Sequence, residues 1–265
     1  MSETSVDGVE VTVADDVMRI VLDRPQRKNA LDPPAMLRVI DALERASVDD
    51  TLRVVVVSSS SGDFCTGADW VSINTPGATR PRTGSIQRRM PLQAHRLIAL
   101  LMEVQLPVVC AVQGWAAGLG CQIALAADFT VATESSRFWL PFLERGFTPD
   151  SGATWLVPRL VGVARAKELL LLGRKVTGRE AADWGMVMRA VADDALDAAV
   201  DALVSALTSK SALVLAMTKQ AVNAAAEALV PTGTAWSDAD ALQTALHDAE
   251  SRAVAARYLE SIARR

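Results

Sequence analysis

The chain predicts an α/β fold, because strand-like and helix-like patterns alternate along it. Five runs are rich in β-branched residues or alternate between apolar and polar ones, as strands do: 9–13, 17–22, 54–58, 108–112 and 129–132. Helical patterns lie between several of them. With 265 residues, 50% of them apolar, the chain can bury a substantial core, which indicates one large domain with an appendage.

Several helices have recognisable starts. Asp32-Pro33 combines an N-cap residue with a first-turn proline, which predicts a helix to about Ser47. The tetrapeptide 177–180, Thr-Gly-Arg-Glu, has the spacing of a capping box. The segment 75–91 is rich in Pro, Gly and Arg and predicts a surface loop leading into a helix over 93–103. Its arginines are candidates for contacts with phosphate groups, although the simpler interpretation is that these side chains are exposed to solvent.

The composition changes after about residue 205. Ala, Leu and charged residues dominate from there, no strand candidate remains, and the helical pattern is broken at 231–233. We therefore divide the chain into an α/β core, 1–205, and a helical region, 206–265.

Charge and cysteine content narrow the class of protein. A formal net charge of −4 gives no reason to expect a nucleic-acid or membrane partner. Residues 1–7 are polar and acidic, unlike a signal peptide. Cys65, Cys110 and Cys121 have no CxxC spacing and stand in apolar surroundings, which predicts buried free thiols and a cytoplasmic location. The apolar run 107–127 has the length of a membrane span, but polar residues interrupt it, so a buried strand and helix explain it better.

Two glycine-containing turns suggest chemistry. The strand over 108–112 runs through Gln-Gly-Trp-Ala-Ala-Gly into an alanine-rich helix that ends near Ala127. Such a turn leaves backbone N–H groups of the first helical turn unpaired, and these are suitable donors for a developing oxyanion. Upstream, the strand over 54–57 is followed by Phe-Cys-Thr-Gly-Ala-Asp-Trp at 64–70.

The two turns in this order resemble the crotonase, or enoyl-CoA hydratase/isomerase, superfamily. The resemblance covers nearly the whole chain, through Asp-Arg-Pro-Gln-Arg-Lys-Asn-Ala-Leu at 23–31, both turns, and the segments 146–152 and 156–162. It implies a crotonase-like spiral of repeated β-β-α units with a C-terminal α-helical trimerisation region. It also implies an acyl-CoA thioester as substrate, coenzyme A being part of that substrate and no other cofactor or metal being needed, and a homotrimer or hexamer.

The resemblance also implies site residues. The N–H groups of Ala68 and Leu119 would hold the thioester oxygen, with the Leu119 side chain beside the acyl pocket where family members usually carry Gly. Coenzyme A would contact residues of the early motif and the first turn, where Asp69 also fixes the turn: Arg27, Lys28, Ala30, Thr66, Ala68 and Asp69. The substrate pocket would be lined by Trp70, Trp115, Gln122, Trp139 and Phe142.

The acids decide which reaction is expected. Hydratases of the family use two glutamates, and this chain has Gln122 and Phe142 at those positions, neither of which can take up a proton. Asp150 matches the aspartate of the ring-epoxide and double-bond isomerases. One carboxylate suffices to remove a proton and return it two carbons away, and enclosure beside Phe142 would raise its pKa. The resemblance therefore implies an acyl-CoA isomerase with Asp150 as acid and base.

Three alternatives remain open. Asp150, within Pro-Asp-Ser-Gly at 149–152, has the sequence of a turn or helix N-cap. The aryl-CoA dehalogenases use an aspartate at this position as a nucleophile, and His95 falls at the position of their catalytic histidine, although Phe142 replaces their assisting tryptophan. A non-catalytic acyl-CoA binding member would also lack both glutamates. Glu144 is expected to face solvent or to pair with Arg145.

Overall fold

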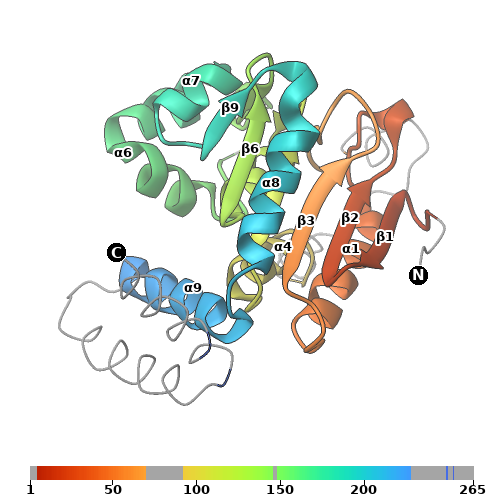
Figure 1. The fold of residues 1–265 in the computed structure, drawn as a ribbon. Helices are drawn as coiled ribbons and strands as arrows, with labels where there is room; N and C mark the ends of the chain where they lie inside the picture. The colour runs from red at the N-terminus through yellow and green to blue at the C-terminus, as the bar shows by residue number, and fades with distance from the viewer. Residues whose placement is uncertain (1–4, 70–91, 146–147, 228–248, 250–252, 254–265) are drawn as a thin grey trace.

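Two β-sheets with helices packed on them make up the computed structural model (Figure 1). It describes residues 5–69, 92–145, 148–227, 249 and 253. Trp70, the predicted loop over 75–91 and the predicted helix break at 231–233 lie outside the described residues.

The large sheet has six strands in the order β1-β2-β3-β4-β6-β9. Only β1 and β2 are antiparallel to each other; the other neighbours are parallel. Its central strands are buried on both faces, which explains their continuous β-branched runs. The five predicted strands are confirmed. The bounds are β1 Val9–Ala14, β2 Val17–Leu22, β3 Val54–Ser59, β4 Val108–Val112, β6 Phe129–Thr133 and β9 Arg189–Val191.

Helices cover both faces of this sheet. On one side α1 (Pro33–Ala46), α4 (Ala94–Glu103) and α5 (Leu119–Ala126) bury their apolar residues with Val55 and Val57 of β3. On the other side α8 (Leu196–Thr208) lies along the sheet and packs on Val54 and Val56 (Figure 1).

The small sheet receives the second strand of each repeated β-β-α unit, which produces the predicted spiral. Its strands are β5 (Trp115–Ala117), β7 (Arg137–Trp139) and β8 (Val176–Thr177). The chain runs β4-β5-α5 and then β6-β7-α6, where α6 is Ala153–Leu171, so the first strand of each unit joins the large sheet and the second joins the small one. Repeated β-β-α units are therefore present, as expected.

The predicted helix starts are also confirmed. The Asp32 carboxylate accepts a hydrogen bond from the Ala35 N–H at 3.0 Å, and Thr177 and Glu180 form the complete capping box of α7 (Gly178–Asp183). The remaining elements are η1 (Pro25–Arg27), η3 (Leu143–Arg145), η4 (Asp193–Ala195) and α9 (Ala212–Glu227). Because α8 passes without interruption through residue 205, the division at 205 stays a prediction.

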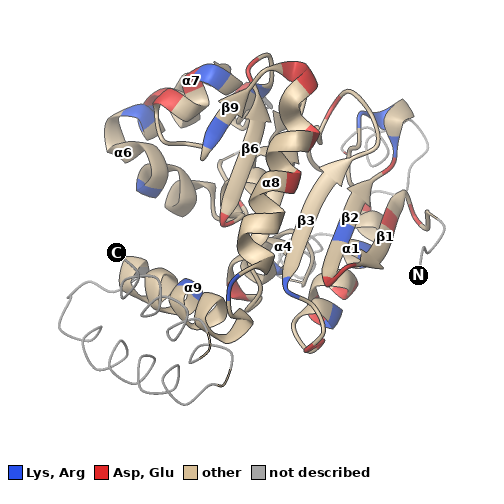
Figure 2. Cartoon of the chain, in the orientation of Figure 1, with Lys and Arg blue, Asp and Glu red and all other residues tan. Residues whose placement is uncertain are grey.

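The surface around α7 carries charges of both signs, and the three thiols lie in the interior. Around α7, basic and acidic residues lie side by side (Figure 2), since Arg174 pairs with Glu168 and Glu180. Cys65, Cys110 and Cys121 are buried free thiols, as predicted. Among the described residues no single helix has the length and apolarity to cross a membrane; the bent pair 193–208 and 212–226 meets that test of length and composition only when both helices are counted together.

Candidate active site

The first turn presents the N–H of Ala68 on the side away from Leu31. The Leu31 N–H donates to the Gly67 carbonyl at 2.8 Å, and the Asp69 N–H donates to the Leu31 carbonyl at 2.9 Å. In a parallel pairing of this kind, the residue between the two bonded ones directs its own N–H and C=O to the opposite side. Ala68 therefore offers its N–H to the neighbouring turn between β5 and α5.

The hydrogen bonds between the segment around Cys65 and strand β5 end at this neighbouring turn. Cys65 pairs with β5 through hydrogen bonds to Trp115 and from Ala117, both of 2.9 Å. Two residues later α5 begins at Leu119, whose N–H, in the first helical turn, has no acceptor within the helix. The helix dipole adds partial positive charge at the same point.

Glycines bring the two turns into contact. Gly67 has φ +96°, and a Cβ placed on it would lie 2.8 Å from the Ala117 carbonyl oxygen and 3.2 Å from the Leu119 nitrogen. A Cβ on Gly120 would lie 2.2 Å from the Cys65 carbonyl oxygen, so a larger residue there would force the turns apart. The backbone segments that carry the N–H groups of Ala68 and Leu119 are therefore in contact, as an oxyanion site formed by these two donors would require.

Leu119 fits this position without strain. It has a helical conformation as the first residue of α5, so the conformational freedom of glycine is not required. Its side chain is buried in the main core cluster, which also contains Phe142.

Asp150 lies just before α6, and its carboxylate is free of the capping role. The N-cap of α6 is Gly152, with no side-chain capping bond. The backbone carbonyl of Asp150, rather than the carboxylate, accepts the Ala153 N–H at 2.9 Å. Partial burial raises the pKa of the Asp150 carboxyl, while a hydrogen bond to Ser151 acts to lower it. The N-cap interpretation is therefore wrong for the Asp150 side chain.

His95 holds the turn that carries Asp150. It lies in the first turn of α4, and its Nε2 accepts the backbone N–H of Ser151 at 3.2 Å. Ser151 is buried and has φ +45°, which is uncommon outside glycine. Ser151 carries no signal of its own in the sequence, since a serine in such a turn has no distinctive spacing.

Gln122 connects Asp150 to α5. It is fully buried, and its Nε2 donates to the Asp150 carbonyl oxygen. It follows Leu119 by three residues, so both lie on the same side of the helix. Leu119, Gln122, Asp150 and His95, which come from three separate segments, are thus brought together.

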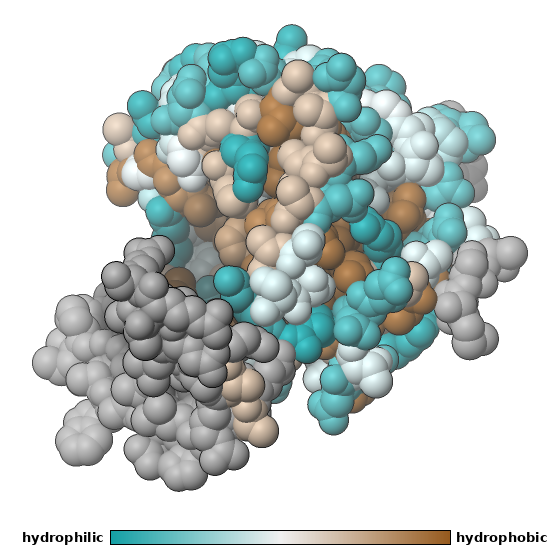
Figure 3. Space-filling model, in the orientation of Figure 1, coloured by the Kyte–Doolittle hydropathy of each residue, from teal (hydrophilic) through white to brown (hydrophobic). Residues whose placement is uncertain are grey.

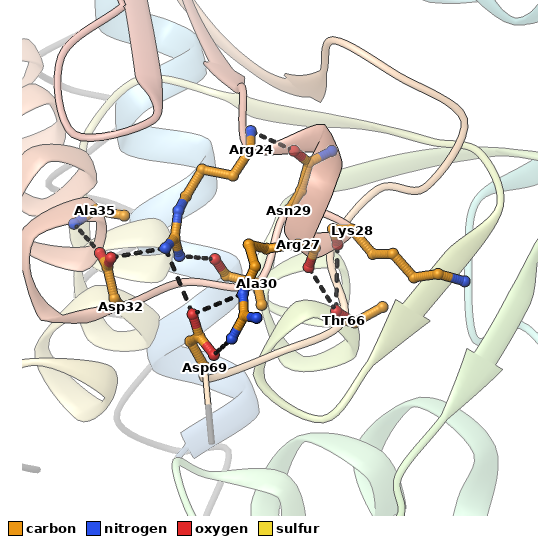
Figure 4. Close-up of polar contacts among 9 residues, drawn as sticks. All are labelled: Arg24, Arg27, Lys28, Asn29, Ala30, Asp32, Ala35, Thr66 and Asp69. Atoms are coloured by element: carbon orange, nitrogen blue, oxygen red, sulfur yellow. Dashed lines mark hydrogen bonds and ion pairs between the residues drawn. The ribbon is translucent and has the colours of Figure 1, made fainter. Parts of the chain in front are cut away.

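Two of the predicted coenzyme A contacts, Arg27 and Asp69, belong to an ion-pair network (Figure 4). The buried Asp69 carboxylate pairs with Arg27 at 2.6 Å and with Arg24 at 3.4 Å, and Arg24 also pairs with Asp32 at 2.8 Å. This network ties η1 to the first turn, so Asp69 fixes the turn as expected. Arg24 stands in the early motif, but the sequence alone did not indicate that it joins two carboxylates.

Lys28, Ala30 and Thr66 adjoin this network. The Lys28 side chain is 62% exposed, with Nζ 3.5 Å from the Asp63 carboxylate, and it is therefore better placed than Arg27 to meet a phosphate. The Lys28 carbonyl accepts a hydrogen bond from the Thr66 hydroxyl at 3.2 Å, and the Ala30 carbonyl accepts one from Arg24. Contact of these residues with coenzyme A stays a prediction.

Trp115 and Trp139 form a cluster with Lys175. Their ring centroids are 6.1 Å apart, and the Lys175 Nζ lies 4.7 Å from the Trp139 ring. The Trp139 indole N–H donates to the Gly173 carbonyl at 3.0 Å. Both rings are only partly buried, and their place in the acyl pocket stays a prediction. Glu144 is exposed, as expected, with its carboxylate against Gly173.

Comparisons with known proteins identify one family. The enoyl-CoA hydratase/isomerase family profile matches residues 12–264. The 1,2-epoxyphenylacetyl-CoA isomerase of Escherichia coli K12 is 34% identical over 210 residues, 79% of each chain. The 4-chlorobenzoyl coenzyme A dehalogenase-2 of an Arthrobacter species is 31% identical over 189 residues, 71% of this chain and 68% of the relative. A solved structure of a Thermobifida fusca YX protein that carries the name enoyl-CoA hydratase, in complex with CoA, has a TM-score of 0.82 at 29% identity, over 91% of this chain and 93% of the other.

Proposed function

The chain belongs to the enoyl-CoA hydratase/isomerase family, and from this premise we propose that it is an acyl-CoA isomerase with Asp150 as its acid and base. It shifts a double bond along the acyl chain or opens a ring epoxide. The observation that carries the proposal is the position of Asp150: its carboxylate is not a helix cap, and Gln122 holds its turn to α5 close to Leu119. Substrate binding is supported by the relative in complex with CoA.

The chemistry follows from two N–H groups and one carboxylate. The Asp150 carboxylate removes a proton from carbon, and the electron pair of that C–H bond moves through the acyl group to the thioester oxygen, forming an enolate. The N–H groups of Ala68 and Leu119 stabilise the enolate oxygen, each by about 3 kcal/mol where such donors have been removed in other enzymes. The protonated carboxyl then returns the proton to a carbon two positions away, which completes the shift.

The site residues support a hydratase function less well than an isomerase function. It requires one group to activate water and a second to manage the proton at the α carbon. Gln122 and Phe142, at the positions where the resemblance implies glutamates, can do neither. Both are buried, and Gln122 uses its amide to hold Asp150.

A dehalogenase is the second candidate, and His95 favours it. The His95 imidazole is bonded to Ser151, beside Asp150, and one relative is an aryl-CoA dehalogenase. In that reaction a carboxylate oxygen of Asp150 would form a bond to the ring carbon and halide would leave. Phe142 supplies no N–H to assist the carboxylate, which weighs against this candidate.

Proton exchange in deuterated water tests the proposal. We expect wild type to incorporate deuterium into acyl-CoA thioesters and Asp150→Asn to exchange about 10²- to 10⁴-fold more slowly, since the proton shuttle is removed. The affinity for the thioester should change little. The control is Asp183→Asn, the same substitution at an exposed position on α7, which should exchange like wild type.

Three other outcomes would contradict the proposal. Exchange that persists in Asp150→Asn would sink the assignment of the acid and base. Thioester binding without exchange in wild type, together with halide release from 4-chlorobenzoyl-CoA, would identify a dehalogenase. Binding with neither reaction would identify a binding protein.

A further inference from the structure

The two ends of the Gln122 amide have different surroundings. Its Nε2 donates to the Asp150 carbonyl oxygen, while its Oε1 is buried and accepts no hydrogen bond from any residue that the structure describes. Folded proteins pair nearly all buried polar atoms, because an unpaired one loses its hydration without compensation. A buried acceptor of this kind is suited to a donor that arrives with a ligand.

The hydrogen bond to Asp150 fixes the direction of the amide. Rotating the amide by half a turn would set Oε1 against the Asp150 carbonyl oxygen, and two acceptors repel each other. Oε1 therefore points away from that carbonyl.

Helix α5 places the Gln122 Oε1 near Leu119 and Asp150, where the proposed reaction takes place. Helical side chains lean toward the N-terminus of their helix, so the Gln122 side chain lies over the turn that begins at Leu119. Asp150 lies on one side of the amide, and the N–H of Leu119 lies at the turn beneath it. A group on the acyl chain between the thioester oxygen and the Asp150 carboxylate would meet Oε1.

We propose that Gln122 is a specificity-determining residue whose Oε1 accepts a hydrogen bond from a hydroxyl carried by the acyl group, so that the site selects hydroxylated acyl thioesters. This inference rests on the proposed function, which supplies the position of the thioester. A neutral amide holds such a hydroxyl without removing its proton, whereas a carboxylate at this position could act as a base. The hydroxyl is then a recognition element that remains on the product.

Equilibrium binding of four matched ligands tests the proposal. The probes are butyryl-CoA and its 2-, 3- and 4-hydroxy derivatives, titrated into wild type, Gln122→Met and Gln113→Met. Methionine keeps the approximate shape of glutamine and lacks the amide. Gln113 is a matched control outside the site, bonded to the Ser61 carbonyl at 2.9 Å.

We expect wild type to bind one hydroxy derivative about tenfold to a hundredfold more tightly than butyryl-CoA. Gln122→Met should lose this preference, and Gln113→Met should keep it. The wild-type comparison stands even if Gln122→Met folds poorly. Equal binding of all four ligands to wild type, or a preference that survives in folded Gln122→Met, would overturn the inference and leave the proposed function intact. Failure of all four to bind would contradict both.

Discussion

At Asp150 the balance between burial and hydrogen bonding sets the pH range of the proposed reaction. Burial disfavours the carboxylate and raises its pKa, and the Ser151 hydrogen bond opposes this. The net direction is upward from the ordinary value of 3.8. A weaker acid has a stronger conjugate base, which suits removal of a proton from carbon.

The first prediction concerns the acidic side of the pH profile. Only the ionised carboxylate can act as base, so kcat/KM should fall as the pH drops through the pKa of folded Asp150, with a midpoint above 3.8. Ser151→Ala removes the hydrogen bond that lowers this pKa, so its midpoint should move to higher pH.

Ser47→Ala is the control for Ser151→Ala. It removes a serine hydroxyl that donates to the Leu43 carbonyl at 2.9 Å, away from Asp150. Its pH profile should match that of wild type. An unchanged or lowered midpoint in Ser151→Ala would show that the Ser151 hydroxyl does not stabilise the Asp150 carboxylate.

At the scale of elements, a buried ion pair fastens α9 to the core. The Lys219 ammonium lies 2.7 Å from the Asp128 carboxylate and donates to the Leu101 and Leu106 carbonyls, each at 3.1 Å. Asp128 also accepts the Val108 N–H at 2.7 Å, at the start of β4. The ion pair thus joins α9, the end of α4 and the strand that leads to the second turn.

The second prediction is that Lys219→Met destabilises the protein strongly. It leaves Asp128 buried without its cation, and breaking a buried pair in this way costs about 3–5 kcal/mol. Urea unfolding followed by circular dichroism measures the change in the free energy of unfolding. The exposed Lys210→Met, between α8 and α9, is the matched control and should change it by less than about 0.5 kcal/mol. Equal effects of the two substitutions would contradict the assigned role of the ion pair.

Elements with strong local signals could be predicted from the sequence, and those set by distant contacts could not. The β-branched runs of β2, β3 and β4 and the capping residues Asp32 and Thr177 carry their own signals. Strands β5, β7, β8 and β9 have two or three residues each and are defined by their neighbours. Helix α6 contains Pro158 and a kink at Gly162, where φ is 77°, both of which weaken a helical pattern.

The candidate site likewise contains residues that could be predicted from the sequence and contacts that could not. The family resemblance named Ala68, Leu119 and Asp150, and the structure brings their segments together. The contact of Gln122 with Asp150 spans 28 residues, and that of His95 with Ser151 spans 56. Such pairings depend on how β-β-α units stack, which no local pattern encodes.

On the scale of the whole molecule, α6 leaves apolar side chains in solvent. Val163 is 62% exposed and Leu172, at the end of the helix, 76%, and Leu160 and Leu171 are also exposed. Apolar surface is visible over α6 in Figure 3. Contiguous apolar patches of this kind mark protein contacts more often than isolated exposed residues do. The family resemblance implies a trimer or hexamer with the C-terminal helical region in the contact, and we expect this surface of α6 to take part in it as well.

The third prediction is therefore an assembly of three or six 28.2 kDa chains in sedimentation velocity, weakened by a charge on α6. Val163→Glu would bury a carboxylate in the contact without compensation, so its mass distribution should shift toward smaller species. Val48→Glu makes the same change at a residue that is 81% exposed beside α1, and it should sediment like wild type. A monomeric wild type would contradict the assembly. An intact assembly in Val163→Glu would move the contact away from α6, because a buried, unpaired glutamate at a close-packed interface would weaken it.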